Sequence, residues 1–88
     1  MAESSAVPTW ASDVDDALDT CGLNCPEPLM LLRNRLRSLD DGARLHVMTT
    51  DPASVRDFEQ LCRFMGHGLA QRYETDGVLH FLIVKGGA

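Results

Sequence analysis

The sequence predicts a two-layer α/β (α+β) sandwich in which a mixed four-stranded sheet carries two helices on one face. Three observations predict it: strand-like and helix-like segments follow the order β-α-β-α-β-β, Asp51-Pro52 is a strong helix start, and Asp76-Gly77 is a hairpin turn signal. Each β-α-β crossover favours parallel strands joined by a right-handed connection, whereas the hairpin adds an antiparallel pair. Two helices can cover only one face of four strands, so we expect two layers.

The first half of the chain predicts a strand, a helix and a second strand. Residues 17–22 are a weak strand candidate because the segment is short and partly polar. Residues 26–39 have helical spacing, and a turn at Gly42 follows them. Residues 43–50 form the second strand, whose side chains alternate between two faces. The apolar stripe of the helix consists of four leucines, namely Leu29, Leu32, Leu36 and Leu39.

The second half predicts a helix followed by a β-hairpin. Asp51 can cap the helix, Pro52 suits its first position, and Gly66 stops it. Residues 69–74 alternate in polarity as a third strand, and residues 78–85 form the fourth and most apolar one. The buried stripe of this helix is expected to comprise Val55, Phe58, Leu61, Cys62 and Met65.

One folded domain is expected from a chain of 88 residues. Residues 1–16 are expected to form a flexible acidic N-terminal tail, because they carry little apolar surface to order them. The folded domain is then expected over residues 17–88. Trp10 is the exception within the tail, and two interpretations stay open: it packs on the domain, or it moves with the tail.

Charge and cysteine content limit the functional classes. A net charge of -5 argues against a generic nucleic-acid binder and against attraction to an anionic membrane. Three cysteines at irregular spacing are a poor disulfide framework and favour a reducing compartment with a free thiol. The sequence shows no signal-peptide pattern and no apolar run long enough to span a membrane. We therefore expect a cytoplasmic protein that acts as a monomer without direct membrane contact.

Cys25 lies where the first strand ends and the first helix begins, and Pro26, Glu27 and Pro28 follow it. At the cap position of a helix, a thiol has its pKa lowered, and the thiolate is the reactive form. The two prolines stiffen the entry turn, whereas the negative charge of Glu27 opposes a thiolate. Moderate activation of Cys25 is therefore expected. The alternative interpretation is that Cys25 is a small apolar residue that only packs under the helix.

Topology supports the first interpretation. If the first two strands are parallel neighbours, their carboxyl ends lie at the same edge of the sheet. Cys25 and Asp51-Pro52 should then be close to each other at two adjacent helix starts. Open α/β sheets usually carry their chemistry at this edge.

The other cysteines and the histidines are weaker candidates. Cys21 is four residues before Cys25, which is not the spacing of a redox pair, so either a core position or a helper thiol is expected. Cys62 lies on the apolar stripe of the second helix and is expected to be structural. A zinc site from these cysteines and His67 matches no common ligand spacing, so no metal site is expected. His67 should lie at the end of the molecule far from Cys25.

The first helix carries a candidate docking surface. Arg33 and Arg37 are four residues apart and share a face, which suits an acidic partner or RNA phosphate. Met30 and Leu31 follow Cys25 by about one turn and flank the leucine stripe, which suits a protein contact. The alternatives are a solvated flank for the arginines and partial burial for the two apolar residues.

The run Leu18-Asp19-x-x-Gly22-Leu23-x-Cys25-Pro26-Glu27-Pro28 resembles the signature of the TusA/SirA-like sulfur carrier family. The resemblance extends over residues 18–87 with almost no change in spacing, and Phe64-Met65-x-His67-x-Leu69 is most similar to TusA within the family. It implies the same two-layer sandwich as the element order. The further matching positions are Gly42, Asp51-Pro52-Ala53, Arg56-Asp57, Cys62, Thr75-Asp76-Gly77 and Lys85-Gly86-Gly87.

The resemblance implies that Cys25 carries sulfur. In the family, this thiol takes sulfane sulfur from a cysteine desulfurase persulfide and passes it to a relay protein such as a TusBCD/DsrEFH-like complex. The relay ends in 2-thiouridine at the tRNA wobble position, so contact with tRNA itself is expected to be indirect or weak. Such a carrier performs sulfurtransferase half-reactions by thiol exchange and needs no metal or organic cofactor.

Two other functions stay open beside this one. The same persulfide carrier serves dissimilatory sulfur metabolism in relatives from sulfur-oxidising bacteria, and a role in cofactor assembly is a related possibility. The other is a non-catalytic regulatory or binding module in which Cys25 only packs. Cys21 departs from the family pattern, which has an apolar residue there, so it is either neutral or a second thiol close to the first.

Overall fold

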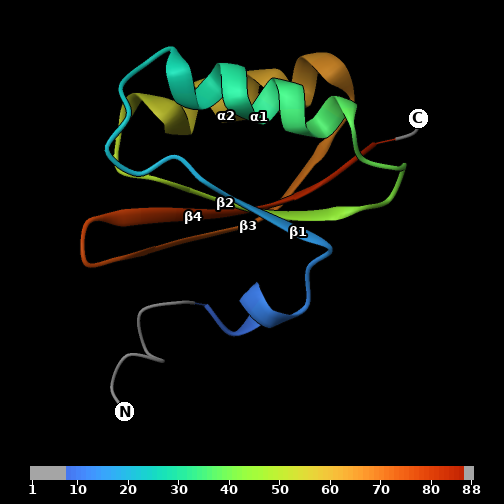
Figure 1. Ribbon diagram of the computed structural model, residues 1–88, viewed down its shortest axis with the longest axis horizontal. Coiled ribbons are helices and arrows are strands. Elements are labelled where there is room, and N and C mark those ends of the chain that lie inside the picture. Colours follow the sequence, from blue (N-terminus) through green and yellow to red (C-terminus); the bar gives the residue numbers. More distant parts are fainter. Residues whose placement is uncertain (1–7, 87–88) are drawn as a thin grey trace.

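Two helices lie on one face of a four-stranded mixed sheet in the computed structural model, which describes residues 8–86 (Figure 1). This arrangement confirms the predicted two-layer sandwich and the order β-α-β-α-β-β. No helix in the described part of the chain combines the length and apolar character needed to cross a membrane. The elements are β1 (Asp16–Asp19), α1 (Glu27–Arg37), β2 (Arg44–Thr49), α2 (Ala53–Met65), β3 (Gly68–Thr75) and β4 (Val78–Val84), preceded by a short 3-10 helix, η2 (Thr9–Ser12).

The strands lie side by side in the order β1-β2-β4-β3. β1 pairs with β2 in parallel, and β4 pairs with both β2 and β3 in antiparallel orientation. The first crossover therefore gives the expected parallel pair, but the second does not, because β4 lies between β2 and β3. The physical reason is burial: β4 has consecutive buried apolar residues, Phe81, Leu82 and Ile83, whereas most of β3 is exposed. The apolar strand takes the central position, and β3 becomes an edge strand.

The core fills the space between the helices and the sheet. Phe58 of α2 and Phe81 of β4 meet edge to face with ring centroids 5.0 Å apart, a favourable aromatic geometry. α1 contributes Leu32 and Leu36 from its leucine stripe, both almost completely buried. Met65, which the helical spacing assigned to the buried stripe of α2, is instead 46% exposed. The other core members are Leu18, Leu45, Val47, Cys62 and Ile83.

The segment before β1 packs against the face of the sheet that the helices leave open (Figure 1). Trp10 of η2 meets the ring of His46 edge-on, with centroids 5.0 Å apart. The guanidinium of Arg44 donates from Nε to the Asp13 carbonyl oxygen at 2.8 Å. Residues 1–7 of the expected flexible tail lie outside the described residues. Residues 8–16 differ from that expectation because aromatic packing and hydrogen bonds hold them on β2.

Beneath Trp10, the sheet carries a buried histidine pair. His46 Nε2 and His80 Nδ1 are 2.8 Å apart, and the two rings stack at an interplanar angle of 25°. His46 is 4% exposed and His80 only 2%. Burial lowers the pKa of both imidazoles, and a charge on His80 would lower the pKa of His46 further. Both side chains therefore favour the neutral form in the folded protein.

Acidification from about pH 7.5 to about pH 5.5 is expected to destabilise the protein. The unfolded chain binds protons at the ordinary histidine pKa of about 6.5, whereas the folded chain binds them only at lower pH. The stabilisation from His46 and His80 is thus fully present above about pH 6.5 and is lost as the pH falls through their folded pKa values. The expected loss in the free energy of unfolding is up to about 1 kcal/mol per histidine, measured by urea unfolding at both pH values.

A double variant, His46→Gln with His80→Gln, serves as the comparison for this pH dependence. Burial and the Lys85 charge also lower the pKa of His67, which therefore contributes with the same sign. The double variant should consequently show a shallower slope of stability against pH, but not a flat one. A slope equal to that of the wild type would show that the buried pair is not its origin.

Candidate functional site

The loop between β1 and α1 is anchored to the end of β2. The Thr20 hydroxyl and backbone N–H both donate to the Met48 carbonyl oxygen, at 2.6 and 2.8 Å. The Gly22 N–H donates to Thr50 Oγ1 at 2.9 Å, and a φ of +86° at Gly22 explains the glycine there. These bonds hold the segment that leads to Cys25 against the carboxyl end of β2.

Asp51 joins this loop to the start of α2. Its Oδ2 accepts a hydrogen bond from the Cys25 N–H at 2.7 Å, and its Oδ1 accepts one from the Ala53 N–H at 3.1 Å. Through this second hydrogen bond Asp51 caps the start of α2 from the residue before Pro52. Pro52, expected at the first helical position, lies instead just before the helix, which begins at Ala53. Cys25 and Asp51-Pro52 are neighbours at the edge where the parallel strands β1 and β2 end.

Cys25 is exposed but does not occupy the cap position of α1. The helix begins at Glu27, after a cis peptide bond between Cys25 and Pro26. The Glu27 N–H donates to the Asn24 carbonyl oxygen at 2.9 Å, so it is not free to hydrogen-bond the sulfur. The expected cap position of Cys25 is therefore wrong, because α1 starts later than the sequence pattern indicated. Pro28 is buried in the first turn of α1, and Glu27 is exposed there.

The sulfur of Cys25 has a carboxylate as its partner. Cys25 Sγ donates a hydrogen bond to Asp57 Oδ2 at a distance of 3.2 Å. This hydrogen bond, partial desolvation, and the negative charges of Asp57 and Asp51 raise the pKa of the Cys25 thiol. The expected activation by the helix terminus is therefore wrong in direction, since nearby carboxylates oppose a thiolate. Asp57 was not among the predicted site residues, and its only sequence signal was its place in the family motif.

The other thiols and His67 have distinct environments. Cys21 is exposed, which contradicts a core position, and desolvation together with Asp19 raises the pKa of its thiol to about 11. Cys62 is buried as predicted, and burial raises the pKa of its thiol to about 11. His67 Nδ1 accepts a hydrogen bond from the Gly86 N–H at 3.0 Å, next to the end of α2. Among residues 8–86, no three His, Cys, Asp or Glu side chains gather as metal ligands.

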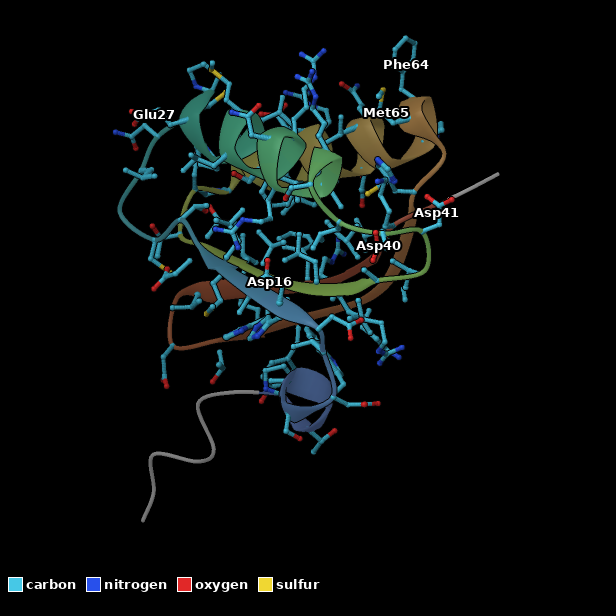
Figure 2. The ribbon with its side chains drawn as sticks, turned by 45° about the vertical axis from the view of Figure 1, so that its right-hand side comes forward. Asp16, Glu27, Asp40, Asp41, Phe64 and Met65 are labelled. Atoms are coloured by element: carbon cyan, nitrogen blue, oxygen red, sulfur yellow. The ribbon has the colours of Figure 1, made fainter. Side chains whose placement is uncertain are left out.

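An apolar hollow lies beside the thiol–carboxylate pair. Its volume is about 630 Å³, and it extends from Asp57 along α2 to Phe64, whose side chain is 89% exposed. Figure 2 shows Phe64 and Met65 at one end of the helix layer and Glu27 at the other. We call this hollow the interhelical groove. Its lining residues are Leu29, Asp57, Gln60, Leu61, Arg63 and Phe64.

The predicted docking residues of α1 lie on the same layer. Arg33 and Arg37 line a second hollow of about 320 Å³, which shares Leu61 with the interhelical groove. Met30 is 57% exposed and Leu31 is 40% exposed. The structure thus leaves both apolar residues on the surface and places the two arginines next to the groove.

Asp51→Ala is expected to lower the free energy of unfolding by about 1–2 kcal/mol, because α2 loses its cap and the Cys25 N–H loses its acceptor. Asp51→Asn should lose less, since its amide oxygen can still accept one of these hydrogen bonds. Urea unfolding of both variants measures the difference. Equal destabilisation by alanine and asparagine would contradict the capping role.

Comparison with known proteins gives a consistent assignment. The family model described as sulfurtransferase TusA matches residues 16–85. The sulfur carrier protein TusA of Pseudomonas aeruginosa is 46% identical over 72 residues, covering 82% of this chain and 91% of the relative. The sulfur carrier protein TusA of Pseudomonas putida is 45% identical over 71 residues, covering 81% of this chain and 89% of the relative.

A solved structure extends the similarity to three dimensions. The crystal structure of a SirA-like protein from Desulfitobacterium hafniense superposes with a TM-score of 0.74 at 26% sequence identity. The match covers 82% of this chain and 99% of that protein. Fold, family model and sequence identity agree, and the chain therefore belongs to the TusA family of sulfur carrier proteins.

Proposed function

We propose that Cys25 accepts sulfane sulfur from a cysteine desulfurase and relays it for 2-thiolation of the tRNA wobble uridine. The proposed acceptor is a relay protein such as a TusBCD/DsrEFH-like complex. The observation that carries the proposal is the position of the Cys25 thiol, which is exposed beside the starts of two helices and whose backbone N–H is held by Asp51. A thiol that must enter the site of another protein has to be accessible and well positioned.

The reaction consists of two thiol exchanges. The Cys25 thiolate attacks the outer sulfur of the donor persulfide, a new S–S bond forms on Cys25, and the donor cysteine leaves as a thiolate. In the second step an acceptor thiolate attacks the outer sulfur of the Cys25 persulfide, and Cys25 leaves as a thiolate. Each step replaces one S–S bond with another and involves no net oxidation or reduction, so this chemistry requires no metal or organic cofactor.

The other two thiols are poorer carriers. Cys62 is 3% exposed in the core, so a donor cannot reach it without unfolding α2. Cys21 is exposed, but its pKa of about 11 leaves it less thiolate at neutral pH than an ordinary cysteine. Access therefore favours the two exposed thiols over Cys62, and the position of Cys25 beside the two helix starts favours it over Cys21.

We further propose that partners dock on the helix layer around the thiol. Met30 and Leu31 offer exposed apolar surface on α1, and exposed apolar residues beside a reactive group suit a protein contact. Arg33 and Arg37 add positive charge next to the interhelical groove, which would steer an acidic surface toward it. Phe64 adds an aromatic side chain of the kind that dominates binding energy at interfaces.

Incubation with a cysteine desulfurase and free cysteine is expected to add one sulfur atom to the wild-type protein. The Cys25→Ser variant should gain none, because it lacks the accepting thiol. Intact-protein mass spectrometry without reductant measures the gain.

Cys21→Ser is the matched control for this experiment, because it removes the other exposed thiol and should still gain the sulfur atom. A gain on Cys25→Ser equal to that of the wild type would exclude Cys25 as the acceptor. In a strain lacking the carrier, wild type should restore 2-thiouridine in tRNA and Cys25→Ser should not. Transfer in vitro without this restoration would assign the carrier to another sulfur pathway.

Charge reversal at Arg33 and Arg37 is expected to weaken binding to the desulfurase about tenfold, because two attractive charges become repulsive. Calorimetry at fixed ionic strength measures the dissociation constant. Arg44→Glu provides a comparison on β2, where the guanidinium contacts Asp13 in the segment before β1, and should leave affinity nearly unchanged. Unchanged affinity in the double reversal would remove both arginines from the interface.

A further inference from the structure

We propose that Asp57 acts as an electrostatic gate on Cys25. In the free carrier its carboxylate keeps the thiol protonated, and a cationic side chain of the docked sulfur donor neutralises it and allows the thiolate to form. The inference rests on the proposed function, in which Cys25 accepts sulfur from a desulfurase. It goes further by naming the residue that decides when the thiol reacts and the charge that the donor must present.

Asp57 is in direct contact with the reacting atom. Asp57 Oδ2 lies 3.2 Å from Cys25 Sγ and accepts its hydrogen bond. Ionisation of the thiol would break this bond and leave two negative groups at contact distance. Like charges this close disfavour the second ionisation strongly. Asp57 is half-buried on α2, so water screens this repulsion less than it would on an open surface.

The charged groups that contact Cys25 are carboxylates. Asp51 contacts the Cys25 backbone from the loop before α2, and Glu27 lies in the first turn of α1. The ion pairs within residues 8–86 join Arg35 to Asp16, Arg44 to Asp13 and Arg72 to Glu59. None of these ion pairs involves Asp57, so its negative charge is available to a partner.

Asp57 also lies where a docked partner can reach it, in the interhelical groove. Asp57 lines the groove together with Phe64, on the side next to Cys25. A donor segment lying in this groove would bring its own side chains to the carboxylate. An arginine or lysine at that point would pair with Asp57 and reverse its effect, because a nearby cation favours a thiolate.

The proton and charge balance of the step follows from this arrangement. On docking, the donor cation pairs with Asp57 and the Cys25 proton passes to solvent. The thiolate attacks the outer sulfur of the donor persulfide, the donor S–S bond breaks, and the donor cysteine leaves as a thiolate. After undocking, the Asp57 charge again faces the sulfur. In the second transfer Cys25 leaves as a thiolate and takes up a proton from solvent, which restores the hydrogen bond to Asp57.

The free protein provides the first test. Asp57→Asn keeps a hydrogen-bond acceptor but removes the charge, so the pH profile of Cys25 alkylation by iodoacetamide should move to lower pH. The rate at about pH 7.5 should rise about three- to tenfold. Peptide-level mass spectrometry separates Cys25 from Cys21. Asp41→Asn is the matched control, since Asp41 lies far from Glu27 in Figure 2 and the variant removes the same charge. Asp57→Glu, which keeps the charge, should retain the wild-type profile.

The second test compares alkylation with sulfur transfer from the desulfurase. In the wild type the transfer profile should lie at lower pH than the alkylation profile, because only the docked donor neutralises Asp57. In Asp57→Asn this gap should shrink. An alkylation profile that Asp57→Asn does not move, or an equal gap in both proteins, would overturn the gate. If wild type accepts no sulfur at all, the proposed function fails instead, which the alkylation profiles distinguish because they need no donor.

Discussion

The carboxylate of Asp51 is the contact on which the candidate site depends. One oxygen accepts from the Cys25 N–H and the other from the Ala53 N–H, so a single side chain holds both the loop before α1 and the start of α2. The parallel strands β1 and β2 end at the same edge and bring these segments together. Asp51 then determines where the thiol lies relative to Asp57 on the helix.

The same arrangement makes the site acidic. A helix start in general favours a thiolate, but Cys25 precedes α1 by two residues and its sulfur hydrogen-bonds a carboxylate. The hydrogen bond to Asp57 and the nearby carboxylates raise the pKa of the Cys25 thiol, which favours its neutral form. A neutral thiol resists oxidation better than a thiolate, which suits a carrier that must react only with its partners. Under the proposed gate, reactivity depends on the charge that a partner brings.

Most of the fold could be predicted from local patterns. The leucine stripe of α1, the Asp51-Pro52 helix start and the Asp76-Gly77 turn each follow from short-range physical rules, and all have the expected structure. The insertion of β4 between β2 and β3 could not be predicted this way, because it depends on which strand gains most from burial on both faces. Whether Trp10 packs on the domain stayed open for a similar reason: its contact with His46 needs a face of the sheet that no helix covers.

The sequence by itself determined the element order, the sandwich, and the closeness of Cys25 to Asp51, because helix signals and parallel connections depend on residues near in the chain. Only the tertiary structure decided the electrostatics of the thiol. Asp57 is 32 residues from Cys25 and reaches the sulfur only when α2 packs beside the loop. The pKa of a side chain depends on charges a few ångströms away in space, which spacing along the chain does not reveal.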